Sequence, residues 1–377
     1  MSMALLQLVA DQLVLGQPLP FNVRDAQGKL LLAKGHLLRS ALQHASLLER
    51  GLYVDVEEFK AVQEGRAYTP PPEKIKTTLF DLWEQAIWRL DTLLKGVDSE
   101  PGFPARCEAF ATQFMALVQR DTDIAIYLSV RQDEKRTNLY GLTHALHAAL
   151  LCQLMAQRMA WPAARTQTLV KAALTMNLAI VDLQGRFAAM GRLSEGQRAQ
   201  IRAHPEQAVQ QLKAAGVTDA AWLEAVMQHH ERPGGGGYPR DLQQVDELAD
   251  ALRLADVFMA KISPRTERPA MPILDAARQM FAEAQGSPLA AAIIKEYGIY
   301  PPGNFIELAS GELAVVIRRG ATAHTPVAAA ITDSSGRPVV RTTQRDTAQP
   351  AYKIKALAAS KQMMERLQPE RLYGLAE

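Results

Sequence analysis

The chain has 377 residues, of which 42 are basic and 40 acidic, so its formal net charge is only +2. This length allows two or three domains, and the balance of charge argues against a protein that a long-range field draws to nucleic acid or anionic lipid. No uninterrupted apolar run is long enough to span a bilayer, no secretory signal is evident, and Cys107 and Cys152 are too few for a disulfide framework. We therefore expect a cytoplasmic protein that binds no nucleic acid and no membrane.

The first 73 residues are expected to form a small module and a linker. Residues 1–66 hold short apolar runs punctuated by glycine and proline, and a short helical pattern follows them, which predicts a small α/β module. Residues 67–73 include three consecutive prolines after Thr69. A proline triplet stiffens the chain and stops a helix, so we place a linker at residues 67–73.

The rest of the chain predicts a mainly α protein with a second β-containing module at its end. Apolar residues recur at three- and four-residue steps almost throughout residues 74–290, which predicts a helical domain. Trp83 and Trp88 lie early in this domain and suit core packing or a homodimer contact. Residues 296–377 show short apolar runs separated by turn residues, as in β-hairpins. We expect a final amphipathic helix that carries Ile354, Leu357, Met363, Met364 and Leu367.

A helix predicted over residues 139–160 is apolar on nearly every side, so we expect it to be buried. His144 shares one of its faces with Ala148, Leu151 and Met155. A single histidine on such a face is usually a core residue with one hydrogen-bond partner. A metal ligand is the alternative, and it needs other ligands nearby.

Three more histidines lie near the predicted ends of later helices. Ser194 and Gln197 form a capping-box pattern at the start of one helix, which we expect to end at His204 because Pro205 would start a new turn. Another predicted helix ends at His229 and His230.

The segment that follows these two histidines contains four consecutive glycines, Gly234–Gly237, and then Tyr238 and Pro239. Glycine is entropically costly, so this run indicates a main chain that bends tightly or lets another group approach closely. Imidazoles beside such a loop suit a metal site or a phosphate pocket. The alternative is a capped helix followed by a flexible surface loop.

Asp256 lies on the apolar stripe of a helix predicted over residues 246–261. A buried carboxylate without a partner is costly, so we expect a cation, a metal or several donors beside it. A salt bridge to Arg253, Arg265 or Arg268 is one explanation. The other is a metal site in the core of a helical bundle, formed by His144, His204, His229, His230 and Asp256.

The order of these residues, from about Tyr140 to Arg268, resembles the HD-GYP family of bacterial phosphodiesterases, which hydrolyse the second messenger cyclic di-GMP. Residues 229–239 read HHERPGGGGYP and resemble the family signature HHExxDGxGYP, with Gly234 in place of the aspartate. The resemblance implies an HD-superfamily helical bundle. It implies metal binding by His144, His204, His229, His230 and Asp256. It implies ligand binding by Arg265, Arg268, Gly235, Gly237, Tyr238 and Pro239.

The chain departs from the family at the paired histidine and aspartate that end the second helix of the bundle. Met176 and Asn177 replace this pair, Ile180 replaces a lysine, and Tyr140 replaces a glutamate that some members carry. In the family the paired aspartate bridges two metals that activate water, and both of its oxygens are needed. Asparagine offers one neutral oxygen, and the methionine thioether is a soft ligand that suits hard ions poorly. We therefore expect no multinuclear centre and no intact catalytic residues at Met176, Asn177 and Ile180.

His204, His229 and His230 could still hold one divalent ion of iron, manganese or zinc, with Asp256 or water as a further ligand. The alternative is a metal-free pocket in which the imidazoles only form hydrogen bonds. Both remain open at the level of sequence.

Three functions are compatible with this pattern. The leading one is a degenerate, catalytically inactive HD-GYP protein that acts as a cyclic di-GMP receptor or as an interaction module for GGDEF-domain or other signalling proteins. The second is an active metal-dependent phosphodiesterase with an altered metal site. The third is a helical scaffold that binds only proteins, and the four glycines argue against it.

Overall fold

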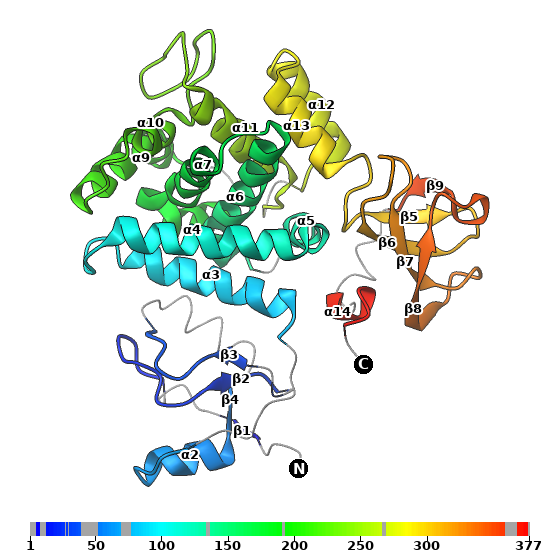
Figure 1. Ribbon diagram of the computed structural model, residues 1–377, viewed down its shortest axis with the longest axis horizontal. Helices are drawn as coiled ribbons and strands as arrows, with labels where there is room; N and C mark the ends of the chain where they lie inside the picture. Colours follow the sequence, from blue (N-terminus) through cyan, green and yellow to red (C-terminus); the bar gives the residue numbers. More distant parts are fainter. Residues whose placement is uncertain are drawn as a thin grey trace. The chain divides into compact units, whose positions relative to one another are not determined.

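In a computed structural model the chain divides into two units, residues 1–99 and residues 100–377. The structure describes residues 5–7, 13–26, 28, 30–38, 52–68, 77–132, 136–190, 193–265, 269–358 and 368–375. The fold is mainly helical, with one small antiparallel sheet near each end of the chain, as the sequence predicts (Figure 1). The expected domains at 1–66, 74–290 and 296–377, with the linker at 67–73, stay predictions.

The first unit contains the strands and helices β1 (Leu5–Gln7), β2 (Val23–Arg24), β3 (Leu30–Leu32), β4 (Tyr53–Asp55), α2 (Val56–Gln63) and α3 (Leu79–Lys95). The strands form an antiparallel sheet in the order β1-β4-β2-β3. Trp83 and Trp88 lie on α3, and both are buried within the single chain. Their burial fits core packing, and the homodimer contact stays a prediction.

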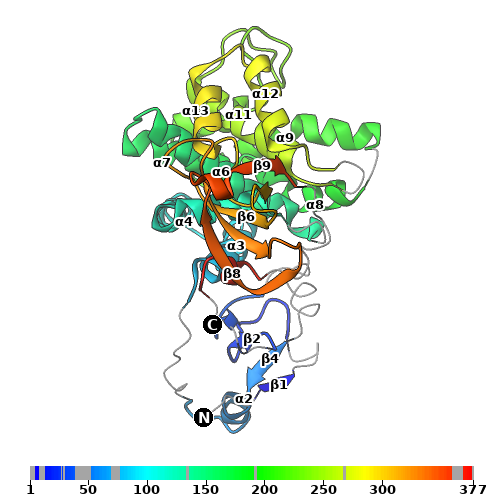
Figure 2. The same ribbon diagram turned by 90° about the vertical axis from the view of Figure 1, so that its right-hand side faces the viewer.

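The helices of the second unit surround α6, whose residues are buried on nearly every side because few of them are charged. Helices α7, α8, α11 and α13 all contact α6, and Figure 2 shows it among them from a second side. The bounds are α4 Phe103–Arg120, α5 Thr122–Val130, η2 Thr137–Leu139, α6 Tyr140–Arg158, α7 Ala163–Thr175, η3 Leu178–Ile180, α8 Val181–Ala189, α9 Glu195–Ala214, α10 Ala220–Gln228, α11 Glu247–Ile262, α12 Ile273–Glu283 and α13 Pro288–Tyr297.

Among the described residues, one helical stretch is long and apolar enough to cross a membrane by length and composition alone. It is Thr137–Arg158, which contains α6. Its most apolar window is 94% buried inside the protein, as in a core helix. The apolar character of α6 is therefore explained by its place in the centre of the bundle.

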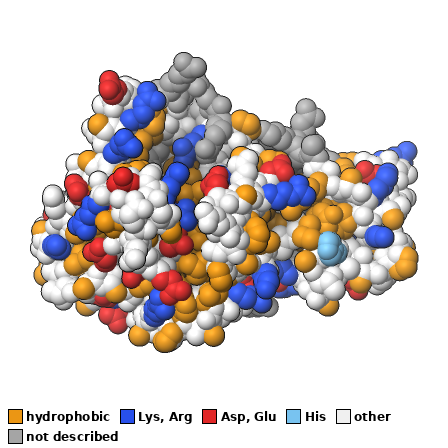
Figure 3. Space-filling view, turned by 90° about the horizontal axis from the view of Figure 1, so that it is seen from above, with side chains coloured by type: hydrophobic (Ala, Val, Ile, Leu, Met, Phe, Trp, Pro, Cys, Tyr) orange, Lys and Arg blue, Asp and Glu red, His pale blue; other side chains and the backbone are white. Residues whose placement is uncertain are grey.

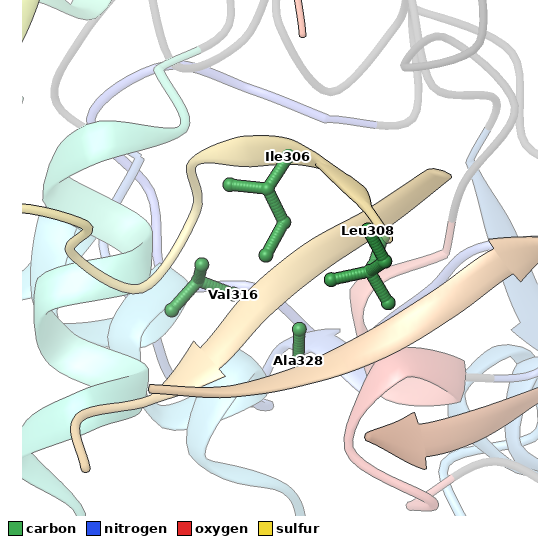
Figure 4. Packing of buried hydrophobic residues seen from close by; sticks show 5 residues of the cluster. Ile306, Leu308, Val316 and Ala328 are labelled. Atoms are coloured by element: carbon green, nitrogen blue, oxygen red, sulfur yellow. The ribbon is translucent and has the colours of Figure 1, made fainter. Parts of the chain in front are cut away.

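The C-terminal sheet consists of β5 (Phe305–Leu308), β6 (Leu313–Arg318), β7 (Val327–Thr332), β8 (Pro338–Asp346) and β9 (Ile354–Leu357). Its strands are antiparallel in the order β8-β7-β6-β5-β9. The core on one face of this sheet is built by fully buried aliphatic side chains, among them Ile306, Leu308, Val316 and Ala328 (Figure 4).

The amphipathic helix expected over Ile354 to Leu367 is wrong at its start. Ile354 and Leu357 lie in β9, where Leu357 pairs with Ile306 of β5. The three-residue spacing between Ile354 and Leu357 fits either a helix turn or a strand. Their partner strand, β5, is distant in sequence, so the local pattern could not identify β9. Met363, Met364 and Leu367 lie outside the described residues. A short helix, α14 (Pro369–Leu372), follows them.

A cluster of ion pairs joins the β-module to the helices of the second unit. Arg319, after β6, places Nε 2.6 Å from Asp123 Oδ1 and Nη1 3.1 Å from Glu296 Oε2. Arg318 contacts Asp121, the N-cap of α5, at 2.9 Å, and Arg158 of α6 donates to Glu296 at 2.6 Å. The sheet is thus fixed to α5, α6 and α13 by a network of half-buried charges, which holds better than isolated surface pairs.

Candidate metal and ligand site

The helix α9 continues through Pro205, so the expected end at His204 is wrong. Proline has no N–H, and the carbonyl of Ile201, four residues earlier, therefore lacks its usual helical donor. The Nδ1 atom of His204 lies 2.5 Å from this carbonyl and donates to it. The lost backbone bond is replaced by a side-chain bond that orients the imidazole, and the helix continues.

His229 is oriented in the same way at the end of α10. Its Nδ1 donates to the carbonyl of Val226 at 2.6 Å, one of the carbonyls that a helix C-terminus leaves without a backbone donor. The Nε2 atoms of His204 and His229 then face each other at 3.0 Å. Because each neutral ring carries its proton on Nδ1, both Nε2 atoms present lone pairs. Two facing lone pairs repel unless a cation lies between them or beside them.

His230 completes a cluster with these two histidines. One ligand nitrogen from each of the three rings lies within 4.8 Å of the others. Burial lowers the pKa of His204 to about 3, and it also lowers the pKa values of His229 and His230. The three rings are therefore neutral near pH 7, which is the form that binds metal.

The donor set fits one divalent ion held by three imidazoles, which are ligands that suit iron and zinc better than manganese. An ion bound there would act as a Lewis acid toward an oxygen of a ligand or of water. A small His-only cluster does not have the carboxylate that would bridge a second ion.

His144 and Asp256 bind each other instead of joining the three-histidine cluster. His144 on α6 places Nε2 2.7 Å from Oδ1 of Asp256 on α11. Burial would raise the pKa of Asp256, but the hydrogen bond from His144 and the neighbouring histidines together lower it. The partner of the buried carboxylate is thus a histidine, and Arg253 pairs with Asp250. His144 and Asp256 could reach a metal only by giving up this bond.

Met176, Asn177 and Ile180 lie where α7 ends and η3 begins, and all three are buried. This end of α7 is tied to α10 by Thr175, whose hydroxyl accepts from Nε1 of Trp222 at 2.8 Å. Helix α9, which carries His204, contacts η3. The departures from the family motif therefore lie beside the helices that carry the histidines. None of the three side chains supplies an anionic oxygen.

Glu231 is a residue of this site whose role sequence reasoning missed. Its side chain is fully buried, and its two oxygens accept from the backbone N–H groups of Arg240 at 2.6 Å and Leu242 at 3.1 Å. The backbone N–H of Asp246, the N-cap of α11, donates to Oε1 of Gln228. The sequence places Glu231 in the HHE…GYP motif, but the motif does not reveal these partners.

The four glycines of the loop are required for two different structural reasons. Gly234, Gly235 and Gly236 all have positive φ, the left-handed region that favours glycine. Gly237 does not, but a Cβ there would lie 2.5 Å from the Cα of Glu231. The loop is therefore built around the buried Glu231, and the interpretation as a merely flexible surface loop is not supported.

Tyr238 and Pro239 follow the glycines and bring the loop back to the histidines. The ring of Tyr238 stacks on His230 with centroids 4.6 Å apart and planes 24° apart. Arg265 lies on another aromatic ring, that of Tyr140, and donates to its hydroxyl at 2.8 Å. Arg268 lies outside the described residues.

Comparison with known proteins finds similarity in the part of the chain that holds this site. A family model described as HD domain matches residues 128–287. The protein named cyclic di-GMP phosphodiesterase PA4108, from Pseudomonas aeruginosa, is 32% identical over 134 residues, which are 34% of this chain and 32% of that protein. This chain thus aligns with about a third of the length of that relative.

A solved structure, Bd1817, an HDG"Y"P protein from Bdellovibrio bacteriovorus, is similar with a TM-score of 0.49 and 16% sequence identity, over 77% of this chain and 98% of that one. The helical bundle, the HD-domain match and the HHE…GYP loop occupy the same residues. Residues 128–287 of this chain thus match an HD domain, and residues 229–239 within them resemble the HD-GYP signature.

Proposed function

We propose that this protein binds cyclic di-GMP through its HD-GYP domain and does not hydrolyse it. The observation that carries the proposal is the pair Met176 and Asn177, buried at the end of α7 where the family's histidine and aspartate are expected. A neutral amide and a thioether do not bridge two hard cations. His204, His229 and His230 could hold one ion, which would supply a Lewis acid for a ligand oxygen but not a two-metal centre.

Three features support a nucleotide ligand rather than an empty scaffold. The loop 234–239 leads into Arg240 and Leu242, whose backbone N–H groups donate to Glu231, and its glycines leave the backbone open to a bound group. Tyr238 offers an aromatic ring beside the histidines. Arg265 offers a guanidinium that can bind phosphate through charge-assisted hydrogen bonds.

Two measurements on the unmodified protein test the proposal. Calorimetric titration with cyclic di-GMP should give binding, and incubation with the messenger plus Mn²⁺ or Fe²⁺ should give no linear product. The double variant Met176→His with Asn177→Asp should gain hydrolysis, because it restores the anionic bridge on a scaffold that already holds three ligands. Rapid hydrolysis by the unmodified protein would overturn the inactive assignment, and absence of binding would overturn the receptor assignment.

A single-ion phosphodiesterase is the second candidate, and the intact three-histidine cluster is the observation that favours it. One ion held by three imidazoles can activate water in other folds. The same assay separates it from the receptor. Slow hydrolysis that needs added metal and is lost in His229→Ala supports the single-ion enzyme.

A further inference from the structure

Arg202 on α9 lies outside the histidine cluster but is connected to it by an aromatic ring. Its guanidinium carbon lies 5.5 Å from the centroid of Tyr238. The ring of Tyr238 is stacked on His230, one of the three cluster histidines. Arg202, Tyr238 and His230 thus form a stack that begins at the exposed side chain of an arginine and ends at the histidine cluster.

A second stack, which also consists of an arginine, a tyrosine and a histidine, ends at His144. The guanidinium carbon of Arg265 is 5.1 Å from the centroid of Tyr140, and the Tyr140 ring stacks on His144 at 5.4 Å with the planes 19° apart. The sequence does not suggest this symmetry, because the two tyrosines are separated by about a hundred residues.

Both arginines have donors that protein groups do not use. Arg240 and Arg253 are each paired with a carboxylate, Glu224 and Asp250. Arg202 has no carboxylate within salt-bridge distance in the part of the chain that the structure describes. Arg265 donates through Nη2 to Tyr140, while its buried Nε has no hydrogen-bond partner there. A buried donor without a partner is costly and is well used by an anionic ligand.

The chain as a whole carries nearly balanced charge, 42 basic against 40 acidic residues. Acidic and basic side chains are interspersed on the face that Figure 3 shows. Selectivity for an anion must therefore come from individually placed guanidinium groups, which bind phosphate oxygens in a fixed geometry. An aromatic ring beneath each guanidinium restricts its motion and strengthens its position through a cation–π contact.

We propose that Arg202, on the Arg202–Tyr238–His230 stack, forms a second anion subsite beside the one proposed above at Arg265, for a ligand that carries two phosphate groups. The inference rests on the proposed binding of a cyclic dinucleotide and adds one residue to it, Arg202. In the sequence Arg202 precedes the loop 234–239, whereas Arg265 follows it. Each subsite binds one phosphodiester. The ring of Tyr238 lies against His230 of the cluster, and the ring of Tyr140 lies against His144, which is bonded to Asp256.

The test compares single arginine variants by titration with cyclic di-GMP. Arg202→Ala and Arg265→Ala should each weaken binding about tenfold, since each removes charge-assisted hydrogen bonds to one phosphate. Each variant should also reduce the dependence of affinity on salt, and lysine at either position should recover part of the affinity. Arg198→Ala is the matched control, because Arg198 is exposed on α9 one turn before Arg202. It should bind as the unmodified protein does.

Two further variants test the rings rather than the charges. Tyr238→Leu should weaken binding as Arg202→Ala does, and adding Arg202→Ala to it should cost little more, because the arginine has already lost its support. Tyr238→Phe should bind normally. Thermal melting of every variant shows whether it is folded.

The outcomes separate this inference from the proposed function. If the unmodified protein binds cyclic di-GMP and Arg202→Ala binds it equally well, the two-subsite inference is overturned while the proposed function stands. If the unmodified protein does not bind cyclic di-GMP, the proposed function is overturned, and titration with pyrophosphate then tests the two arginines alone. Loss of pyrophosphate binding in both arginine variants supports paired anion subsites, and binding that neither variant changes overturns them.

Discussion

Pro205 shows at the scale of one residue how this site is prepared. A proline inside a helix is usually destabilising, yet here it leaves the Ile201 carbonyl to the Nδ1 of His204. That bond sets the tautomer and leaves Nε2 for a metal, as partners of metal-binding histidines commonly do. Pro205 thus helps to orient His204 and does more than remove one backbone hydrogen bond from α9.

We predict that Pro205→Ala weakens metal binding without unfolding α9. The alanine N–H would compete with His204 for the Ile201 carbonyl, so the imidazole would be held less firmly. Loss of such a supporting bond typically lowers metal affinity by about tenfold to a hundredfold. Competition with a chelator measures it. Pro288→Ala is the control. Pro288 lies in the first turn of α13, where a backbone N–H would have no partner within the helix, so this change should leave the affinity for metal unchanged.

His147 gives a prediction about pH. Burial lowers its pKa to about 3, with a smaller contribution from His144. In the unfolded chain a histidine titrates near pH 6.5, so its contribution to stability is complete above that pH and is lost as the pH falls toward 3. Between pH 6.5 and 5 this one group costs about 2 kcal/mol of unfolding free energy.

Denaturant unfolding at several pH values tests this. His147→Gln should be less stable than the unmodified protein at pH 7 but should lose less stability on acidification. His324→Gln changes an exposed histidine and serves as the control. An acid profile that His147→Gln leaves as steep as before would contradict the assignment.

Gly237 tests the packing of the loop. A Cβ at this position would lie 2.5 Å from the Cα of Glu231 and 2.6 Å from the backbone N of Arg232, and neither backbone atom can move cheaply. We expect Gly237→Ala to cost about 1 to 3 kcal/mol and to weaken nucleotide binding, because the loop must shift away from the histidines. Gly196→Ala meets open space near the start of α9 and should be neutral or slightly stabilising. Equal stability of the two variants would refute this.

At this scale the sequence predicts which residues matter better than whom they contact. His229 and His230 could be grouped because they are adjacent at a helix end and begin one family motif. His204 could be added only through the family resemblance, since the helix end predicted there is wrong. The bond between His144 and Asp256 could not be predicted, because it joins two helices that are 112 residues apart in sequence. The role of Glu231 depends on two backbone donors in a loop whose path the sequence does not give.

At the scale of elements, the end of α7 is held by one side-chain bond to α10. The hydroxyl of Thr175 accepts from Trp222 Nε1 and itself donates to the carbonyl of Lys171. Both side chains are buried, so the indole N–H has no access to water if the hydroxyl is removed. This bond positions Met176 and Asn177 against the helices of the histidine cluster.

We predict that Thr175→Val, which keeps the shape of the side chain, lowers the free energy of unfolding by about 1 to 3 kcal/mol through the buried indole donor left without a partner. Thr143→Val on α6 removes a hydroxyl that bonds only to carbonyls of its own helix, and we expect a change within about 0.5 kcal/mol. Chemical denaturation compares them. Equal effects would show that the bond to Trp222 does not stabilise this end of α7.

Element types were predictable where periodicity was long, and less so where it was short. The buried α6 and the amphipathic α11 have enough turns for their pattern to be unambiguous. The four residues of β9 do not, and their assignment depends on the distant strand β5. The continuity of α9 depended on His204 replacing one backbone bond, which a rule for proline does not include.

At the scale of the whole molecule, the second unit joins the HD domain and the C-terminal sheet through charges that meet from different elements. Arg318 and Arg319 reach α5 and α13, while Arg158 reaches α13 from α6. The sequence predicts both modules from their periodicity. It does not predict this contact, because no local pattern relates Arg319 to Asp123 or Glu296.

The central claim for the whole protein is that three histidines hold one ion and that no second ion is bridged beside it. Measuring bound metal per chain in protein purified without an affinity tag tests this claim most directly, with the Met176→His and Asn177→Asp double variant prepared in parallel. We predict one ion per chain in the unmodified protein, none in His229→Ala, and a second ion in the double variant. Two or more ions per chain in the unmodified protein, or none at all, would contradict the account.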